Sequence, residues 1–385
     1  MIVFQMGGKP IKAWVPTQES IEWGAQEQAM NLSKLPFAFR HIAIMPDVHR
    51  GMGMPIGGIL AADQVVVPNA VGVDIGCGMC AVKTSMVYMA DDLIKKVMGE
   101  IRQRIPLGRD WHEDDRNRTR MPDLPMGPVV EKQYGRAVRQ MGTLGGGNHF
   151  IEIQKGDDDH IWLMLHSGSR NLGKQVGDYH NKVAKEWNAR YHSSVPAHWG
   201  LAYLPLKTQE FDDYWKDMDY CVEFARLNRL VMMEQVVFSV MEHIIEVTFE
   251  EPIDVSHNYA DWENHFKKNV IVHRKGAIRA REGEPCIIPG CQGGYSYICK
   301  GLGNPQSFHS ASHGAGRVMS RTQAKRELNL EDELKKMEGC IHGIRSQGDL
   351  DEAPSAYKDI DEVIANEADL VEPLVKMRGI AVIKG

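Results

Sequence analysis

The stretch Val71-Gly72-Val73-Asp74-Ile75-Gly76-Cys77-Gly78-Met79 places an acid and a thiol among three glycines. Its apolar residues favour a strand, and glycine permits a turn in which two side chains approach closely. A strand that ends in Asp-x-x-Cys would offer a hard oxygen and a soft sulfur together, which indicates a transition-metal site. Taken alone, the stretch instead favours a tight turn with a capping Asp74 and a buried free Cys77. The rest of the chain must decide between the two.

Length and composition exclude several classes of protein. The chain has 385 residues, 43% of them apolar, which is enough for a large core in one elaborate domain or two smaller ones. A net charge of -6 gives no global basic field, so a nucleic-acid partner would be held by local patches. Seven cysteines without a regular framework, and no signal-peptide pattern, predict a reduced, cytoplasmic protein. No apolar run reaches the roughly 20 residues of a membrane span, so no membrane role is expected.

Hydrophobic periodicity predicts helices and strands along the whole chain. Helices are expected at about 17–33, 91–105, 174–191 and 211–245, and strands at 41–45, 59–67, 150–154, 161–165, 270–272 and 380–383, with extended structure at 71–84. Residues 106–128 predict a surface loop, and residues 255–259 fit no regular element. Glycine-rich motifs recur from residue 46 to residue 316, so we expect one integrated α+β domain over residues 1–385.

Several histidines sit beside small or polar residues at the ends of apolar runs, as Asp74 and Cys77 do. Asp74, Cys77, His149, His166 and His257 supply one carboxylate, one thiolate and three imidazoles. This is the donor set of a mixed divalent-metal site, and it would serve two ions if one ligand bridges them. The alternative is that Cys77 and Cys80, with Cys-x-x-Cys spacing, form a redox or zinc pair, although no second pair follows.

His313 lies in a different setting, Ser-His-Gly-Ala-Gly before a helical pattern. Backbone N–H groups at a helix start suit a phosphate, and an imidazole facing a phosphorus atom can act as a nucleophile beside a metal. A histidine in a structural turn is the alternative. The glycine-rich loops match neither a Walker A motif nor a complete dinucleotide fingerprint, which disfavours a kinase, a P-loop NTPase or a Rossmann dehydrogenase.

Five motifs together resemble the RtcB family of RNA ligases. They are Met45-Pro-Asp47-Val-His49, the stretch 71–79, Gly-Gly-Asn148-His149-Phe150-Ile-Glu152, His166-Ser-Gly-Ser-Arg170 and Ser312-His313-Gly-Ala-Gly-Arg317. They follow the family's order, and the match runs from about residue 40 to the end of the chain. The resemblance implies an RtcB-like fold, with mixed and antiparallel sheets around a metal centre and flanking helices.

The resemblance also implies an activity. RtcB ligases join a 3′-phosphate or 2′,3′-cyclic phosphate RNA end to a 5′-hydroxyl end, using GTP and manganese, in RNA repair or tRNA splicing. Asp74, Cys77, His149, His166 and His257 would bind two Mn²⁺ ions, and His313 would attack the α-phosphate of GTP and become guanylylated. Asp47 would orient His313. Arg170 and Arg317 would clamp phosphate groups, because a guanidinium pairs bidentately with phosphate oxygens.

The family's guanine nucleotide pocket maps onto a larger set of residues. These are Asn148, His149, Phe150, Ile151, Glu152, His257, Asn258, Pro289, Gly290, Cys291, Gln292, Ser296, His313, Gly314, Ala315, Gly316, Tyr357 and Lys384. The Glu152 carboxylate suits the guanine N1–H and N2–H₂ donors. Two positions depart from the family pattern: Cys291 stands where relatives have Ser, and Ser256 stands where some relatives have His.

Partners follow from the same resemblance. RNA ends are the expected substrate, an archease-type activator is an expected partner, and a monomer is the default state. Basic residues at 267, 268, 274, 275, 279 and 281, with the arginines of 102–120, would form the phosphate-binding footprint, or else belong to solvated faces. Two other functions stay open: an enzyme that caps 3′-phosphates by guanylylation without sealing, and a non-catalytic, metal-stabilised RNA-binding protein.

Overall fold

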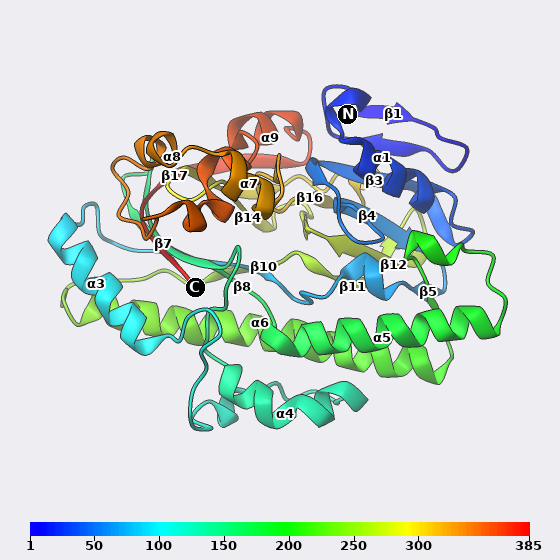
Figure 1. Ribbon diagram of the computed structural model, residues 1–385, viewed down its shortest axis with the longest axis horizontal. Coiled ribbons are helices and arrows are strands. Elements are labelled where there is room, and N and C mark those ends of the chain that lie inside the picture. The colour runs from blue at the N-terminus through cyan, green and yellow to red at the C-terminus, as the bar shows by residue number, and fades with distance from the viewer.

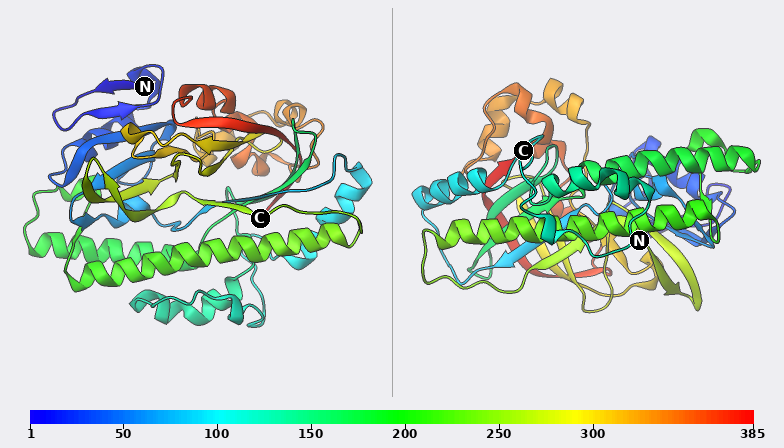
Figure 2. Two further views of the ribbon diagram at one scale, coloured as in Figure 1. Left: turned by 180° about the vertical axis from the view of Figure 1, so that it is seen from behind. Right: turned by 90° about the horizontal axis from the view of Figure 1, so that it is seen from below.

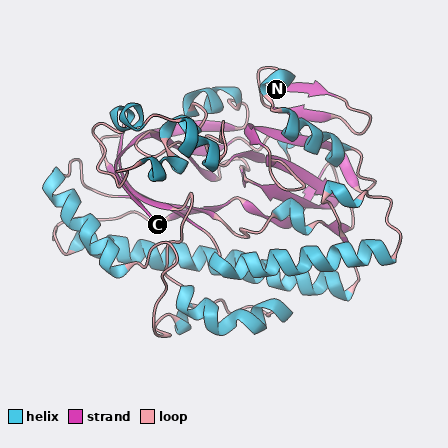
Figure 3. Ribbon diagram, in the orientation of Figure 1, coloured by secondary structure: helices cyan, strands magenta, loops and turns pink.

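Two β-sheets form the centre of the molecule in this computed structural model, which describes residues 1–385 (Figures 1 and 3). The six-stranded sheet has the order β1 (Ile2–Phe4), β2 (Ile11–Ala13), β3 (Ala38–His49), β4 (Ile56–Ala62), β12 (Lys268–Lys275) and β11 (Asn258–His265). Its strands are antiparallel except for the pair β2 and β3. This sheet delivers Asp47 and His49 at the end of β3.

The seven-stranded sheet is antiparallel throughout. Its order is β10 (Ile253–Ser256), β6 (Gly78–Lys83), β8 (Ile161–Ser167), β7 (Phe150–Gly156), β17 (Val371–Lys384), β15 (Tyr295–Gly301) and β14 (Pro285–Pro289). Two short pairs complete the strands: β13 (Ala277–Arg279) with β16 (Ser310–Ser312), and β5 (Val65–Val66) with β9 (Leu204–Pro205).

Nine α-helices surround the sheets. They are α1 (Trp23–Ser33), α2 (Pro68–Val71), α3 (Asp91–Arg104), α4 (Pro128–Gln140), α5 (Arg170–Arg190), α6 (Gln209–Met241), α7 (Arg321–Glu327), α8 (Leu330–Lys336) and α9 (Ile360–Asn366). The long helices α5 and α6 run side by side along one side of the molecule, whereas α7, α8 and α9 lie on the opposite side (Figures 1 and 2). No helix is long and apolar enough to cross a membrane.

Strand alternation divides the core into two layers on either face of the seven-stranded sheet. Met79 and Ala81 of β6 face Ala43 and Met45 of the other sheet in one buried cluster. Their neighbours Cys80 and Val82 point the other way, into a cluster with Leu163 of β8 and Met232 and Val236 of α6. Helix α6 therefore packs directly behind β6 and β8, and this position matters for the site.

The predicted α+β class is confirmed. The structure has the expected helix at 91–105 and the expected strands at 150–154 and 161–165. The other three helices have different ends. The helix expected at 17–33 begins only at Trp23, the one expected at 174–191 begins at Arg170, and the one expected at 211–245 runs from Gln209 to Met241. The expectation of extended structure over 71–84 is wrong in its first half. Pro68 starts the helical turn α2, and a glycine loop then leads to β6. Asp74 and Cys77 therefore precede a strand rather than follow one.

Two further differences have clear physical reasons. Residues 128–140 form α4, whose buried Val129, Val130, Ala137 and Val138 give it an apolar face, although no helix was expected there. Residues 255–259 belong to β10 and β11, which are separated only at His257. β10 is defined by pairing with β6, which is distant in sequence, whereas β11 pairs with the next strand along the chain, β12, in a hairpin.

Candidate metal centre and adjoining cavity

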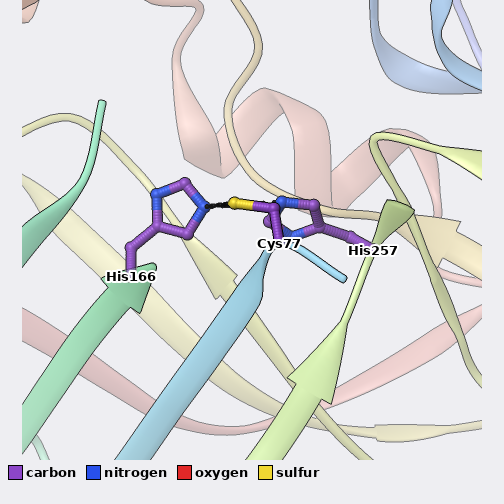
Figure 4. A group of neighbouring side chains, drawn as sticks. All are labelled: Cys77, His166 and His257. Atoms are coloured by element: carbon purple, nitrogen blue, oxygen red, sulfur yellow. Dashed lines mark hydrogen bonds between the residues drawn. The ribbon is translucent and has the colours of Figure 1, made fainter. Parts of the chain in front are cut away.

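Three neighbouring strands bring candidate ligands to one edge of the seven-stranded sheet (Figure 4). Cys77 immediately precedes β6, His166 lies near the end of β8, and His257 immediately follows β10. Because β6 runs antiparallel to both neighbours, its start meets their ends. The antiparallel topology thus gathers residues that are far apart in sequence.

The donor atoms of these side chains lie close together. Cys77 Sγ is 3.2 Å from His166 Nε2, and His166 Nε2 is 3.4 Å from His257 Nε2. Cys77 Sγ is also 3.5 Å from His149 Nε2, which in turn is 3.4 Å from Asp74 Oδ2. The ligands therefore form two groups, Cys77–His166–His257 and Asp74–Cys77–His149, with the atoms of each group within 4.8 Å of one another. Cys77 belongs to both.

Backbone carbonyls fix two of the imidazoles in a ligand-ready orientation. His149 Nδ1 donates to the carbonyl of Leu144 (2.9 Å), and His166 Nδ1 donates to the carbonyl of Asn148 (3.1 Å). A carbonyl can only accept, so these contacts place the ring proton on Nδ1 and leave the Nε2 lone pair for an ion. This arrangement is the usual support for a histidine ligand.

The electrostatics of the cluster favour a bound cation. Burial and the neighbouring imidazoles hold the pKa of His166 and of His257 well below the ordinary value, so both rings stay neutral. Burial, together with the nearby Asp74 carboxylate, raises the pKa of Cys77 well above its usual range. Neutral imidazoles, a carboxylate and a thiol fit a divalent transition ion, which would stabilise the thiolate.

The alternative pairing of Cys77 with Cys80 is not supported. Cys80 is fully buried in the apolar cluster behind the sheet and belongs to neither ligand group. Burial raises the pKa of its thiol, with the Asp254 carboxylate adding to the effect. Alternation along the chain therefore separates two thiols that the sequence places three residues apart.

His313 adjoins this ligand cluster and is held by Asp47. His313 Nδ1 donates to Asp47 Oδ2 at 2.6 Å, and the backbone N–H of His313 donates to the same oxygen at 3.1 Å. Asp47 is fully buried, and the His313 ring lies edge-on to His257 with 4.8 Å between ring centroids. Since Nδ1 carries the donated proton, His313 Nε2 keeps its lone pair.

A cavity of 210 Å³ opens beside His313. Its lining includes residues that the sequence analysis names: His49, Asn148, Phe150, His166, His257, Pro289, Gly290, Gln292, His313, Gly314, Ala315, Gly316, Arg317, Tyr357 and Lys384. Ile56, Arg321 and Glu352 complete it. Phe150, Pro289 and Lys384 come from β7, β14 and β17 of the seven-stranded sheet. His166 and His257 belong both to the cavity wall and to the ligand cluster. The cavity and the cluster are therefore neighbours on one edge.

Glu152 and Ser296 lie behind this cavity. Gln154 links them, because its Nε2 group donates to Glu152 Oε2 (2.5 Å) and to Ser296 Oγ (3.2 Å). Burial raises the pKa of Glu152 to about 7, although the bond from Gln154 opposes the shift. Cys291 is close enough that the charge of Glu152, added to burial, raises the pKa of its thiol to about 11. The thiol therefore stays protonated.

Three predicted site residues use their side chains wholly or mostly in contacts within the protein. The Ile151 side chain lies in the apolar cluster behind the sheet, because strand alternation turns it to the opposite face from the side chains of its neighbours in β7. The Asn258 amide donates to the carbonyl of Asp74 (3.0 Å) and accepts from the backbone N–H of Gly276 (2.7 Å). Arg317 lines the cavity, but its guanidinium donates to Glu352 (3.0 Å), to the Tyr357 hydroxyl (3.3 Å) and to the carbonyls of Met319 and Asp351, which leaves one N–H for a ligand.

Arg170 lies on the other side of the ligand cluster. It starts α5 with a φ of 59°, in the left-handed region, and donates to Thr143 Oγ1 (3.0 Å) and to the carbonyl of Gly108 (3.1 Å). Burial lowers its pKa, and the carboxylate of Asp74 opposes this shift. A strained, oriented and largely buried guanidinium next to a candidate metal ligand is typical of a functional residue.

Two basic residues proposed for an RNA footprint are not available to RNA. Arg274 is fully buried and pairs with Glu263, and Lys275 Nζ donates to the carbonyls of Met52 and Asn69. Both belong to β12, whose last six residues are buried by the strands on either side. Sequence reasoning also missed Arg321 and Glu352 of the cavity wall, although the spacing of Arg317 and Arg321, four residues apart, offered a signal for the first.

Comparison with known proteins gives a consistent result. A family model described as "tRNA-splicing ligase RtcB" matches residues 28–125 and 111–385. An "RNA-splicing ligase RtcB" of Escherichia coli (strain K12) is 39% identical over 98% of this chain and 97% of its own length. A "tRNA-splicing ligase RtcB" of Nanoarchaeum equitans is 31% identical over 93% of this chain and 91% of its own length. An "RNA-splicing ligase RtcB" of Mycobacterium tuberculosis is 30% identical over 93% of this chain and all of its own length (100%).

Proposed function

The chain belongs to the RtcB family of RNA ligases, and on that premise we propose that it joins 3′-phosphate or 2′,3′-cyclic phosphate RNA ends to 5′-hydroxyl ends with GTP and Mn²⁺. The observation that carries the proposal is the arrangement of His313. Its imidazole is oriented by Asp47, adjoins the metal-ligand cluster and lines the cavity. That is the arrangement a nucleophile needs if it acts beside a metal.

Two Mn²⁺ ions would be held by the two ligand groups, with Cys77 as the shared ligand. His166 and His257 would complete one group, and Asp74 and His149 the other. When bound, the ions would neutralise charge on phosphoryl oxygens. The protein's own contribution is to present neutral Nε2 donors, through the carbonyls that hold the Nδ1 protons of His149 and His166.

In the proposed first step, His313 Nε2 attacks the α-phosphorus of GTP. A bond forms between nitrogen and phosphorus, and the bond to the β-phosphate oxygen breaks with release of pyrophosphate. Asp47 stabilises the cationic ring by accepting the Nδ1 proton in a hydrogen bond of 2.6 Å. The guanylyl group then passes to the RNA 3′-phosphate and regenerates His313. Attack by the 5′-hydroxyl on that phosphorus forms the new phosphodiester and releases GMP.

Guanine would be selected by Glu152, which lies behind the cavity. An ionised carboxylate accepts from both the N1–H and N2–H₂ groups, which adenine does not present in that pattern. Gln154 fixes the position of one carboxylate oxygen. Cys291 places a protonated thiol nearby, where relatives have a hydroxyl, so its contact with the nucleotide would be weaker.

The decisive experiment is covalent labelling. We expect the protein with Mn²⁺ and α-³²P-GTP to take up acid-labile, alkali-stable label, and His313→Ala to take up none. His309→Ala is the matched control, because His309 lies four residues earlier and does not line the cavity. An unlabelled wild type, or a labelled His313→Ala variant, would refute the assignment of the nucleophile.

Incubation with end-labelled RNA separates sealing from related activities. Joined product supports ligation. A guanylylated 3′ end that never becomes joined would indicate a capping enzyme, and RNA binding without any covalent GMP would indicate a non-catalytic protein. We further propose a monomeric, single-domain cytoplasmic enzyme whose turnover an archease-type activator increases. Sedimentation and turnover assays with and without such an activator test these points.

A further inference from the structure

A fully buried arginine on α6 lies directly behind the candidate metal centre. Arg229 has no exposed side-chain surface, and α6 packs across β6, β8 and β10, the three strands that carry Cys77, His166 and His257. A guanidinium is costly to bury unless its charge is balanced and its donors are all satisfied. Its contacts therefore indicate what it does.

Arg229 donates a hydrogen bond to a residue adjacent in sequence to each of the three ligands. Its Nη1 group donates to the carbonyl of Gly76 (2.7 Å), just before Cys77, and to the carbonyl of Ser167 (3.1 Å), just after His166. Its Nη2 group donates to Ser256 Oγ (3.1 Å), just before His257. One rigid planar group thus holds three chain segments that meet only in the folded protein.

Asp254 balances the charge of this guanidinium. Arg229 Nε and Nη2 donate to the two Asp254 oxygens at 2.6 and 2.7 Å. Together with Gly76, Ser167 and Ser256, this bidentate pair uses all five N–H donors that an arginine has. A lysine, with three donors on one atom, cannot reproduce this fork.

The backbone is shaped to admit the guanidinium. Ser256, Gly78 and Ser167 lie opposite one another on β10, β6 and β8. A Cβ atom at Gly78 would lie 2.9 Å from Arg229 Cζ, so the absence of a side chain there is what allows the approach. Gly76, with a φ of 74°, likewise rests on α6, where a Cβ would lie 2.8 Å from Val222 Cα. Both glycines of the Cys77 loop are thus fitted to the helix.

We propose that Arg229 is a positioning residue that sets the spacing of Cys77, His166 and His257 for metal binding. The inference rests on the metal centre proposed above and extends it to α6, which supplies no ligand itself. Replacing Arg229 should therefore weaken metal binding more than the loss of a buried ion pair elsewhere would.

Arg274 provides the matched control. It too is fully buried and makes a bidentate pair, with Glu263. Its other bonds go to Ser310, Phe308 and the side-chain hydroxyl of Tyr259. None of these is the immediate neighbour of a ligand, and Tyr259, two residues after His257, is the nearest of them. Arg229→Lys and Arg274→Lys therefore make the same chemical change, but only the first removes bonds to the immediate neighbours of all three ligands.

The test measures Co²⁺ binding to the purified full-length protein by titration, with thiolate-to-cobalt absorption as the readout for Cys77. We expect Arg229→Lys to weaken Co²⁺ affinity by about 10- to 100-fold and to reduce the absorption, while Arg274→Lys binds as the wild type does. Thermal melting of the metal-free proteins should show both variants destabilised to a similar degree. Unchanged Co²⁺ binding by Arg229→Lys, or an equal loss in Arg274→Lys, would overturn the proposal.

Ser256→Ala covers the case in which Arg229→Lys does not fold. It removes one acceptor and leaves the ion pair intact, so we expect a folded protein with Co²⁺ affinity reduced about two- to tenfold. Wild-type affinity in this variant would then count against the positioning role. If the wild-type protein itself binds no Co²⁺ or Mn²⁺, the metal centre is refuted, which is a separate outcome from failure of Arg229 alone.

Discussion

The interaction of Asp47 with His313 offers the sharpest quantitative test of the proposed chemistry. Asp47 is fully buried, and one oxygen, Oδ2, accepts both the ring Nδ1–H and the backbone N–H of His313. A hydrogen bond to a charged group contributes about 1.5–3 kcal/mol. At about 1.4 kcal/mol for each factor of ten in rate, Asp47→Ala should slow guanylylation of His313 by about 10- to 150-fold.

Asp47→Asn separates the charge of the carboxylate from the geometry that it imposes. Because both bonds go to Oδ2, an asparagine with its oxygen in that place keeps them, and its amide nitrogen then occupies the Oδ1 position. Asp47 Oδ1 has no hydrogen-bond partner, so the buried NH₂ group should cost about 1–3 kcal/mol of stability. We therefore expect a smaller loss of labelling rate than in Asp47→Ala, together with a lower melting temperature than the wild type.

The assay is single-turnover labelling with α-³²P-GTP at saturating Mn²⁺, quenched over time and resolved on a denaturing gel. Melting curves of the same preparations check that each variant is folded at the assay temperature. Wild-type labelling by Asp47→Ala would show that Asp47 does not orient His313. A slower reaction in Asp47→Asn than in Asp47→Ala would show that the retained bonds do not determine the rate.

Three further outcomes are expected. Burial raises the Glu152 pKa to about 7, and guanine binding needs the ionised carboxylate, so GTP affinity should fall about tenfold for each pH unit below 7. Isothermal titration should show no such pH dependence in Glu152→Gln. A pH dependence that persists in Glu152→Gln would exclude Glu152 as its source. Cys77→Ala removes a ligand from both ligand groups, so it should bind Mn²⁺ at least about tenfold more weakly. Far-ultraviolet circular dichroism should still show a folded protein. Retained Mn²⁺ affinity would contradict the role of Cys77 as the shared ligand. Gly78→Ala should melt at a lower temperature and bind Co²⁺ more weakly, because its Cβ would meet the backbone oxygen of Val255 as well as Arg229 Cζ. Gly99→Ala is the control: it lies in the middle of α3 with no atom within 4 Å of the new Cβ, and it should gain about 0.5–1 kcal/mol of stability. A stabilised Gly78→Ala would refute the close approach.

Local sequence patterns predicted the parts of the fold that depend on local periodicity. The helix at 91–104 and the strands at 150–156 and 161–167 follow from their own apolar patterns. Val71, Val73 and Ile75 favour a strand, but residues 72–77 form a glycine loop. The loop folds as it does because Gly76 must lie against α6, more than 140 residues later in the chain. Contacts of that separation leave no local pattern.

The sequence by itself determined which chemical groups this protein offers: one thiol, one carboxylate, three imidazoles and a further histidine followed by glycines. Those residue types are written in the chain, and no folding is needed to recognise them. Only the tertiary structure decided which of them meet, because antiparallel pairing joins the start of β6 to the ends of β8 and β10. It also distinguished arginines that look alike in sequence. Arg229 donates its hydrogen bonds behind the candidate metal ligands, whereas Arg274 pairs with Glu263. The sequence does not show this difference, because the environment of a buried charge is created only when distant strands and helices pack together.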